Sequence, residues 1–411
     1  MTMQLLNLIQ GAEVEWKNIT EIFKIRNGYT PSKNNLDFWD ENLATIPWFR
    51  MEDIRANGHI LSDSIQHITE KAVKGNLFKA NSIIIATSAT IGEHALITVD
   101  FMCNQRFTCF TISDEYEDKV LPKFAYYYFF SIDKFVQQTQ KQSSMPAADM
   151  EALKKLEIPI PSLEIQQKVV EILDKMTDYV TELTAELTLR QKQYSYYRDQ
   201  LLTFPSQSDS DESLTVRWLK MGEFGEFIRG NGMQKKDFVE SGFPAIHYGQ
   251  IYTKYGLTAD ETFTYVSEDL AKKLRQADNN DLLLATTSEN DEDVCKPLAW
   301  LGNRAAISGD MMIFRHEQNV KYLAYYIQTE MFQKDKKRKI TGTKVRRVSS
   351  SDLSNLIIPL PNLTEQKRIV EILDKFDKLT SDLSEGLPCE IKLRQKQYEY
   401  WREQLLSFKK E

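Results

Sequence analysis

The sequence predicts an α+β protein: two mixed α/β domains separated by two long helices that form an antiparallel coiled coil, with an internal pseudo-twofold repeat. Three observations predict this fold. Segments recur about two hundred residues apart, two of them show helical periodicity, and the rest of the chain alternates short β-rich runs with Gly, Asn and Pro turns. A chain of 411 residues can build more than one hydrophobic core.

The repeat is clearest in two stretches. "IPIPSLEIQQKVVEILDKM" begins at Ile158 and "IPLPNLTEQKRIVEILDKF" begins at Ile358, while "LRQKQY" begins at Leu189 and again at Leu393. The first pair is offset by 200 residues and the second by 204, so the second copy holds four extra residues between them. A tandem duplication, with its two units in a ring around a pseudo-twofold axis, explains both pairs.

The domains have diverged more than the helices. One similarity between the domains remains visible: "KFAYYYFF" at Lys123 resembles "KYLAYYIQ" at Lys321. The repeat divides the chain into a first domain over 1–157, a helical spacer over 158–204, a flexible acidic linker over 205–213, a second domain over 214–357 and a second helical spacer over 358–411.

Each spacer has the pattern of a long amphipathic helix. From Ile165 to Phe204, apolar residues recur at spacings of three and four, after a proline pair that stops any earlier helix. About forty residues extend about 60 Å, and the apolar stripe needs a partner, which the other copy supplies. In the second copy, Gly386 and Pro388 predict a break.

The domains read as mixed α and β. "NSIIIATS" (81–88) and "DLLLATTS" (281–288) are β-rich runs, and the segments 121–140 and 319–334 read as helices. Their aromatic clusters suit packing better than base stacking. The four cysteines lack metal-like or disulfide-like spacing, so we expect reduced packing residues in a cytoplasmic protein, and no apolar run is long enough to cross a membrane.

Charge is unevenly distributed. The net charge of −7 argues against a protein that binds DNA by bulk electrostatics alone. "KDKKRKITGTKVRR" (334–347) nevertheless gathers eight basic residues against one acid, which predicts contact with a polyanion; a disordered, solvated loop is the alternative.

Enzyme signatures are missing from the sequence. It contains no GxxxxGK[ST] loop, no GxGxxG fingerprint and no Asp-Pro-Pro-Tyr or Asn-Pro-Pro-Tyr tetrapeptide. Asp291, Glu292, Asp293 and Lys296 form an acidic loop with one lysine, a weak nuclease pattern, and the five histidines have no metal-like spacing. We therefore expect no intrinsic catalysis and no bound metal.

The order of variable domain, "IPxP" motif, helix, second variable domain and second helix resembles the specificity subunit of type I restriction-modification systems. "EQKRIVEILDKF" at Glu365 is the most specific piece, supported by "SATIGEH" (88–94) and "CNQRF" (103–107). The second domain departs from the pattern, because "SENDEDVCKPLAWLG" (288–302) replaces the first motif and no Asn-Gln pair is evident.

The resemblance implies a non-catalytic subunit that binds double-stranded DNA. Each variable domain would be a target recognition domain that reads one half of a split, asymmetric site, and the helices would hold the two apart. Two methyltransferase subunits would bind around this scaffold with S-adenosylmethionine and methylate adenine at N6. Further restriction subunits would use ATP and magnesium, so no cofactor is expected on this chain.

Candidate DNA contacts follow from side-chain chemistry: Arg and Lys suit guanine, Asn and Gln suit adenine, and Lys, Arg, Ser, Thr and Tyr suit phosphates. In the first domain these are Arg26, Asn27, Tyr29, Thr30, Lys33, Arg50, Thr87, Ser88, Asn104, Gln105 and Arg106. In the second they are Arg229, Asn231, Gln234, Lys235, Lys236, His247, Tyr248, Gln250, Lys344, Arg346 and Arg347. Solvation alone is the alternative for any of these surface groups.

The repeated "LRQKQY" predicts a partner-docking face presented twice. Its tyrosines, Tyr194 and Tyr398, fall on the apolar stripe, so the polar residues should point outward. The predicted docking residues are Arg190, Lys192, Gln193, Arg394, Lys396 and Gln397. "VTELTAELT" (180–188) resembles the tetrapeptide repeats that set half-site spacing in one branch of the family.

A coiled-coil adaptor that holds two protein-binding domains without nucleic acid is the competing function. The basic cluster and the paired domains speak against it. A pull-down with and without duplex DNA discriminates, since an adaptor should ignore the DNA.

Overall fold

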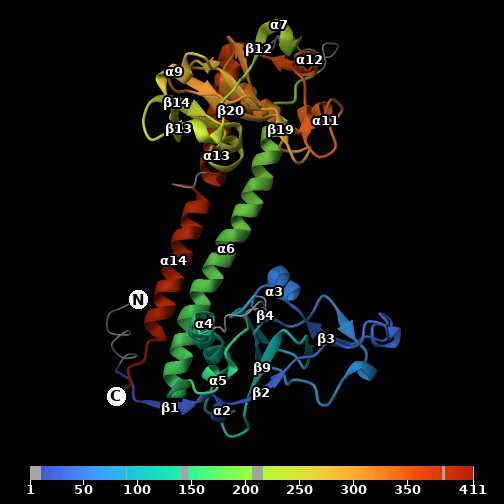
Figure 1. Ribbon diagram of the computed structural model, residues 1–411, viewed down its shortest axis with the longest axis vertical. Helices are drawn as coiled ribbons and strands as arrows, with labels where there is room; N and C mark the ends of the chain where they lie inside the picture. The colour runs from blue at the N-terminus through green and yellow to red at the C-terminus, as the bar shows by residue number, and fades with distance from the viewer. Residues whose placement is uncertain (1–10, 89, 140–146, 206–215, 382–384, 411) are drawn as a thin grey trace. The chain divides into compact units, whose positions relative to one another are not determined.

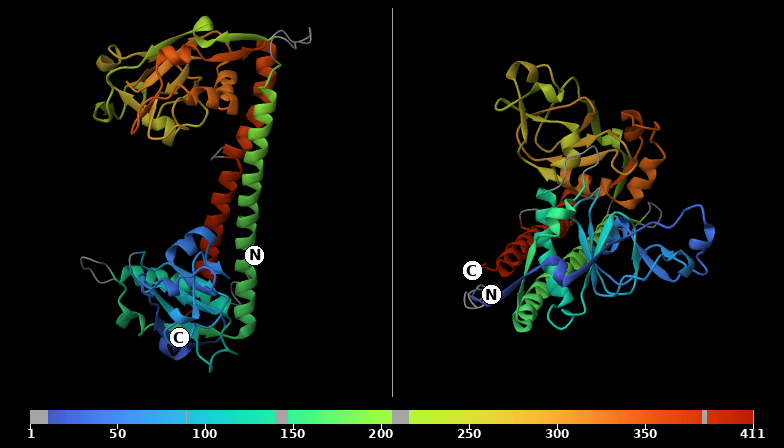
Figure 2. Two further views of the ribbon diagram at one scale, coloured as in Figure 1. Left: turned by 90° about the vertical axis from the view of Figure 1, so that its right-hand side faces the viewer. Right: turned by 60° about the horizontal axis from the view of Figure 1, so that its bottom comes forward.

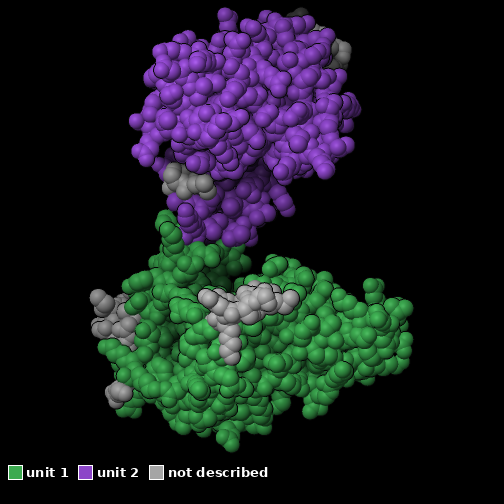
Figure 3. Space-filling view, in the orientation of Figure 1, with its two compact units in different colours: residues 1–181, 393–411 green, residues 182–392 purple. Residues whose placement is uncertain are grey.

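The computed structural model describes residues 11–88, 90–139, 147–205, 216–381 and 385–410. It divides into two compact units, residues 1–181 with 393–411 and residues 182–392 (Figure 3). Each unit holds one α/β domain together with helix segments from both copies of the repeat. Among the described residues, no helix is long and apolar enough to span a membrane.

Domain 1, the part of unit 1 between strands β1 and β10, is built on a five-stranded sheet in the order β2-β9-β6-β7-β4 and a three-stranded sheet in the order β5-β3-β8 (Figure 1). The strands of the larger sheet are β2 (Phe23–Asn27), β9 (Phe107–Ile112), β6 (Ser82–Ala86), β7 (His94–Ile97) and β4 (Ile60–Leu61). The smaller sheet has β5 (His67–Ile68), β3 (Ile46–Phe49) and β8 (Met102–Cys103). The helices are α2 (Ile19–Ile22), α3 (Met51–Asn57), α4 (Pro122–Gln138) and α5 (Met150–Leu153), with short 3₁₀ turns η1 (Leu36–Phe38) and η2 (Glu70–Ala72).

Domain 2, between β11 and β24, repeats the order of the larger sheet and adds two outer strands to the smaller one, despite its different sequence. Its sheets run β12-β22-β18-β20-β15 and β13-β16-β14-β21-β17. The strands are β12 (Gly225–Arg229), β13 (Phe238–Val239), β14 (Phe243–Ile246), β15 (Thr258–Ala259), β16 (Thr264–Val266), β17 (Gln276–Ala277), β18 (Leu282–Ala285), β19 (Thr287–Ser288), β20 (Lys296–Trp300), β21 (Ala305–Ile307), β22 (Met311–His316) and β23 (Arg346–Arg347). The helices are α7 (Met221–Phe224), α8 (Tyr248–Thr253), α9 (Glu268–Ala271), α10 (Val320–Ile327), α11 (Glu330–Lys337) and α12 (Ser350–Ser354), with the 3₁₀ turn η3 (Lys235–Asp237).

Successive side chains of a β-strand point to opposite faces of the sheet, and this alternation explains why each central strand lies between two hydrophobic cores. Ile83 and Ile85 of β6 face a core with α4, while Ile84 and Ala86 face a second core with the smaller sheet. In domain 2 the alternating leucines of β18 divide between two cores in the same way. A strand buried on both faces has to be apolar throughout, as "SIIIA" and "LLLA" are.

The two ends of each domain pair with each other. β1 (Val14–Asn18) runs antiparallel to β10 (Glu157–Pro161), with Trp16 opposite Pro159. β11 (Arg217–Lys220) runs antiparallel to β24 (Ile357–Leu360), with Trp218 opposite Pro359. The first and last strands of each domain therefore lie side by side, and the last one, which carries the repeated "IPxP" motif, leads directly into the following helix.

The helices match the predicted pattern, including the break. α6 (Leu163–Leu201) is continuous in all views, whereas the second copy is split into α13 (Leu363–Ser381) and α14 (Leu387–Leu405) (Figures 1 and 2). In unit 1 the start of α6 packs with the end of α14, through Val169, Leu173 and Leu405. In unit 2 the end of α6 packs with α13, where the rings of Tyr197 and Phe376 stack at 5.6 Å.

Equivalent polar residues attach each domain to its own helix. Gln166 is fully buried; its side chain accepts from the Leu121 N–H at 2.9 Å and donates to the carbonyls of Lys119 and Pro161. Gln366 is also fully buried and makes the equivalent contacts with the Asn319 N–H and the Pro361 carbonyl.

A second pair of contacts is duplicated about two turns further along. Lys123 and Tyr127 of α4 both donate to Asp174, each at 2.7 Å. In unit 2, Lys321 and Tyr325 of α10 both donate to Asp374, each at 2.8 Å. The two aromatic helices α4 and α10 are only weakly similar in sequence. The lysine and tyrosine that they share are the residues that bind each domain to the aspartate of the repeated "EILDK" motif.

Two expectations are confirmed and one is modified. The aromatic residues of α4 and α10 pack in the cores. All four cysteines are free, and Cys103, Cys109 and Cys295 are buried, whereas Cys389 is partly exposed. The helix predicted over 319–334 is two helices. Gln328 caps the end of the first, and Thr329 caps the start of the second, with its hydroxyl accepting from the Phe332 N–H at 3.3 Å.

Candidate nucleic-acid interface

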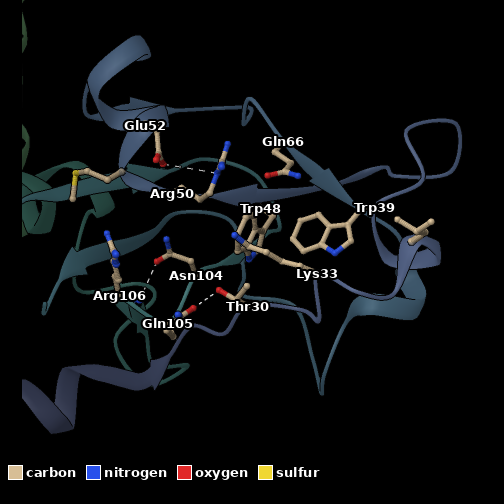
Figure 4. Close-up of a pocket in the computed structure, with 12 residues that line it drawn as sticks. Thr30, Lys33, Trp39, Trp48, Arg50, Glu52, Gln66, Asn104, Gln105 and Arg106 are labelled. Carbon is tan, nitrogen blue, oxygen red and sulfur yellow. Dashed lines mark hydrogen bonds and ion pairs between the residues drawn. The ribbon is translucent and has the colours of Figure 1, made fainter. Parts of the chain in front are cut away.

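Six predicted contact residues of domain 1 come together in one open cleft of about 520 Å³ (Figure 4). They are Thr30, Lys33, Arg50, Asn104, Gln105 and Arg106. The other lining residues are Leu36, Trp39, Trp48, Met51, Glu52 and Gln66. Cations, amides and aromatic rings therefore share one surface, which is the composition that base edges and phosphates require.

A glycine allows the first wall of this cleft to form. The chain after β2 passes so close to the β8–β9 turn that a Cβ at Gly28 would lie 2.2 Å from the Asn104 carbonyl oxygen. The Gly28 N–H donates to the Phe107 carbonyl at 2.9 Å. This approach places Thr30 beside Gln105, whose side-chain oxygen accepts from the Thr30 hydroxyl.

The second wall is the junction of β3 and α3. Arg50 occupies the N-cap of α3, and its backbone N–H donates to the Asp53 carboxylate at 2.6 Å. Its guanidinium lies 5.6 Å from the Trp48 ring and 3.9 Å from the Glu52 carboxylate. Trp48 is in turn held edge-to-face by Trp39 at 5.1 Å, so the wall is supported by packing.

The three amides of the cleft differ in how much of their hydrogen-bonding capacity is in use. Asn104 folds its turn by accepting from the Arg106 N–H at 3.0 Å, and Gln105 accepts from Thr30. The Gln66 side chain, which precedes β5, makes no hydrogen bond to any described residue. Sequence reasoning missed Gln66, Trp39, Trp48 and Glu52. Trp48 and Glu52 flank Arg50 but are not of the residue types by which DNA contacts were chosen, whereas Gln66 reaches the cleft through the pairing of β3 with β5.

The remaining domain 1 candidates do not line this cleft. Arg26 is exposed, yet its guanidinium donates to the Asn76 carbonyl at 2.7 Å and stacks on Phe78. Asn27 accepts from Thr108, and the Tyr29 hydroxyl accepts from the Lys74 N–H at 2.8 Å. Thr87 and Ser88 follow β6; the Thr87 N–H and hydroxyl both donate to the Arg106 carbonyl, and Ser88 bridges to Ala147.

Domain 2 has the same backbone framework with different side chains. A Cβ at Gly230 would lie 2.0 Å from the Ser308 carbonyl oxygen, as Gly28 lies against Asn104. The turn equivalent to 104–106 is therefore 308–310, Ser-Gly-Asp, which has no amide. Domain 2 therefore has no counterpart of the Asn104–Gln105 pair at this turn.

The position equivalent to Arg50 is His247, the N-cap of α8. His247 and Gln250 are both largely buried, and the Gln250 side-chain oxygen accepts from the His247 N–H at 3.0 Å. Burial, with the nearby Lys235 charge, lowers the pKa of His247 below its ordinary value. These two side chains are thus engaged in capping, while Tyr248 beside them is half-buried.

Exposed candidates of domain 2 lie around β12 and η3. Arg229, Gln234, Lys235 and Lys236 are exposed. The Asn231 side chain is engaged instead, donating to the Lys273 carbonyl at 2.9 Å and accepting from the Arg275 N–H at 2.8 Å. The equivalent loop of domain 1 forms part of the cleft.

The basic run 334–347 is ordered in α11 and β23, and it is not one exposed surface. The contact of this run with a polyanion stays a prediction, but Lys336 does not present its side chain on the surface, because it is 1% exposed. Its ammonium donates to the carbonyls of Glu292 and Val294 at 3.0 and 2.7 Å, and burial lowers its pKa. Lys336 therefore supports the acidic loop from within.

The end of the run pairs with that loop. β23 runs antiparallel to β19, and Arg346 makes a 3.0 Å ion pair with Asp291. Lys344 and Arg347 are exposed. Within the described ranges, no group of three or more His, Cys, Asp or Glu side chains could hold a metal ion. Asp291, which belongs to the weak nuclease pattern, forms its ion pair with Arg346.

The predicted docking residues have the same local arrangement in both copies. Arg190 donates to Gln193 at 3.0 Å and pairs with Glu186. Arg394 donates to Gln397 at 3.1 Å, and its guanidinium lies 5.1 Å from the Tyr179 ring. Tyr194 is buried and Tyr398 half-buried, as predicted, whereas Lys192 and Lys396 are exposed without a partner among the described residues.

Comparison with known proteins agrees with this duplication. The family model for the type I restriction modification DNA specificity domain matches twice, at residues 12–190 and 215–393. The specificity subunit of the type I restriction enzyme EcoprrI from Escherichia coli is 37% identical over 399 residues, covering 92% of this chain and 91% of that protein. A putative specificity subunit from Haemophilus influenzae is 28% identical, covering 98% of this chain and 97% of that protein.

Solved structures share the fold. A chain from a study of complex assembly and conformational transition of the type I R-M system matches with a TM-score of 0.64 and 18% identity, over 96% of this chain and 97% of that chain. The S subunit from M. genitalium matches with a TM-score of 0.50 and 16% identity, over 97% of each chain.

Proposed function

This chain belongs to the type I restriction modification DNA specificity family, and from that premise we propose that its two domains each read one half of a bipartite, asymmetric DNA site. The specificity function itself follows from family membership. The division into two half-sites is supported by two domains with one topology and different polar side chains.

The cleft of domain 1 is the observation that carries this proposal. Base reading requires amides and guanidinium groups that are held in place and still have free donors and acceptors. Arg50, Arg106 and Gln66 all line one open cleft, and the Gln66 amide makes no hydrogen bond to the described residues. Domain 2 has histidine, serine and aspartate at the backbone positions equivalent to Arg50, Asn104 and Arg106, so its half-site has a different sequence.

The long helices fit the role of a spacer. α6 is a single helix of 39 residues that contributes to both units. A helix is stiff and rises 1.5 Å per residue, so its length would fix the number of unread base pairs between the half-sites.

The chemistry would belong to partner subunits. We propose that two methyltransferase subunits, carrying S-adenosylmethionine, dock on the duplicated surface around Arg190 and Arg394, and that restriction subunits add ATP- and magnesium-dependent activity. The chain itself would be non-catalytic. Two equivalent polar faces on one chain suit two copies of one partner.

Mapping of N6-methyladenine in the host genome, with and without this gene, tests the proposal. Loss of methylation at one bipartite motif on deletion is the expected result. An unchanged methylome in a strain whose methyltransferase partner is active would overturn it.

A further inference from the structure

We propose that Gln66 reads an adenine in the half-site bound by domain 1. The inference rests on the proposed function and deepens it, because it names one base pair and the side chain that selects it. Nothing in the sequence pattern around Gln66 marks it as a contact residue.

The backbone of Gln66 is fixed at its carbonyl oxygen by two hydrogen bonds. Its carbonyl oxygen accepts from the Trp48 N–H at 3.1 Å and from the Ser64 hydroxyl at 2.7 Å. Ser64 is itself buried and also accepts from the Trp48 N–H at 2.9 Å. The Cα position of Gln66 is therefore set by strand pairing and does not depend on a bound ligand.

The side chain extends into the cleft from this support. Figure 4 shows it between Arg50 and Trp39, across the cleft from Asn104, Gln105 and Arg106. Within the described ranges its amide has no hydrogen-bond partner, whereas the Asn104 and Gln105 side-chain oxygens are both in use. Gln66 is thus the cleft amide that retains both its donor and its acceptor.

Adenine is the base that uses both groups at once. Its major-groove edge offers N7 as an acceptor and the N6 amine as a donor, so a carboxamide can bind it through two hydrogen bonds. Guanine presents two acceptors there, one of which would face the amide oxygen. The pyrimidines offer a single polar group each, so they lose one of the two bonds.

Domain 2 supplies an internal comparison. The β3–β5 pairing places Pro47 opposite His67, and the β14–β16 pairing places Pro244 opposite Tyr265. The residue before each of those partners is Gln66 in domain 1 and Thr264 in domain 2. The Thr264 hydroxyl already donates to the Ala245 carbonyl at 2.8 Å, so this position is engaged within the protein in domain 2.

The test uses the full chain assembled with its methyltransferase subunits and duplex DNA carrying the motif that methylome mapping defines. Each adenine of the domain 1 half-site is replaced in turn by 7-deazaadenine, which removes the N7 acceptor alone. For the parent complex, one position should weaken binding. Gln66→Met, which keeps the length of the side chain without its amide, should weaken binding to natural DNA by about 5- to 150-fold and abolish the effect of the analogue at that position only.

Two further variants sharpen the outcome. Gln66→Glu should move the preference at that position from adenine toward cytosine, because a carboxylate accepts from the cytosine N4 amine. Thr264→Val, the matched control in domain 2, should leave the response to analogues unchanged. Parent-like binding by Gln66→Met, or an undiminished analogue effect, would overturn the inference. A parent complex that binds no motif at all would instead overturn the proposed function.

Discussion

The Tyr127 hydroxyl donates a 2.7 Å hydrogen bond to the Asp174 carboxylate, and Tyr325 repeats the contact with Asp374 at 2.8 Å. All four residues lie at the junction of an α/β domain and its following helix. The contact has survived a duplication after which the surrounding domain sequences diverged, so we expect it to matter for stability.

Tyr127→Phe should lower the free energy of unfolding of unit 1, and Tyr325→Phe that of unit 2, each by about 1.5–3 kcal/mol, because the lost hydrogen bond has a charged acceptor. Urea denaturation followed by hydrogen exchange would measure the size and the location of each effect. Tyr128→Phe is the control, since the Tyr128 hydroxyl has no hydrogen bond within the described part of the chain. Equal effects of Tyr127→Phe and Tyr128→Phe would contradict the prediction.

His316 should make unit 2 sensitive to acid. Burial lowers its pKa from 6.5 to about 4, and its Nδ1 accepts from the Gln318 N–H at 3.1 Å. Above pH 6.5 the ring is neutral in both the folded and the unfolded state. As the pH falls from 6.5 toward 4, only the unfolded state gains the proton, so the free energy of unfolding falls by about 3 kcal/mol.

His316→Asn keeps an acceptor for the Gln318 N–H but cannot titrate. Its stability relative to the parent protein should therefore rise between pH 7 and pH 4, as measured by urea denaturation at several pH values. A constant difference between the two proteins across this range would count against the assignment.

Lys33 and Arg106 should affect DNA binding in different ways. Lys33 is exposed at the rim of the cleft and suits a phosphate, so Lys33→Ala should weaken binding to all sequences and lower the salt slope by about 1. Arg106→Ala should cost about 1–3 kcal/mol and relax specificity at one position. Binding titrations at several salt concentrations measure both, with exposed Lys155→Ala as the control outside the cleft.

Charge reversal on the duplicated face should weaken docking of the methyltransferase. Lys192→Glu with Lys396→Glu is a sharper test than a change at Arg190 or Arg394, whose guanidinium groups also contact Gln193 and Gln397. Like-charge contacts cost several kcal/mol, so affinity should fall at least tenfold in analytical ultracentrifugation. If the double variant still assembles fully and keeps its helicity, the face is exposed to solvent only and does not bind the methyltransferase.

Deleting residues 184–187 of α6 should shorten the spacer. The deletion removes about 6 Å of helix, so the tolerated spacer should lose at least one base pair. Replacing the same four residues with four alanines keeps the length and is the control. Methylome mapping of both strains measures the number of unread base pairs between the half-sites. An unchanged number in the deletion strain would refute the prediction.

The fold was largely readable from sequence because its strongest signals are periodic. Long amphipathic stripes, a proline pair and a glycine-proline break predicted α6, α13 and α14 with their interruption. The shared topology of the domains was hidden, since strands such as β3 and β8 pair across more than fifty residues and impose only a demand for apolar side chains.

The site was readable only in part, for a related reason. Residues next to a tight turn, such as Thr30 and Asn104, could be predicted as DNA contacts from the local sequence. Gln66 reaches the cleft through a strand pair that sequence does not reveal. Gln250 has the same chemistry as Gln66, but a capping position consumes its side-chain oxygen, and only the fold distinguishes the two.

The pairing of β1 with β10, and of β11 with β24, has an evolutionary consequence. Both ends of a domain meet at one point of the framework, and the lysine and tyrosine that reach Asp174 or Asp374 travel with the domain. A foreign domain that brings those strands and those two side chains would fit either helix without disturbing the other half. If each domain reads one half-site as proposed, exchange of one domain between genes would be expected to change that half-site in a single step and to leave the proposed docking surface unaltered.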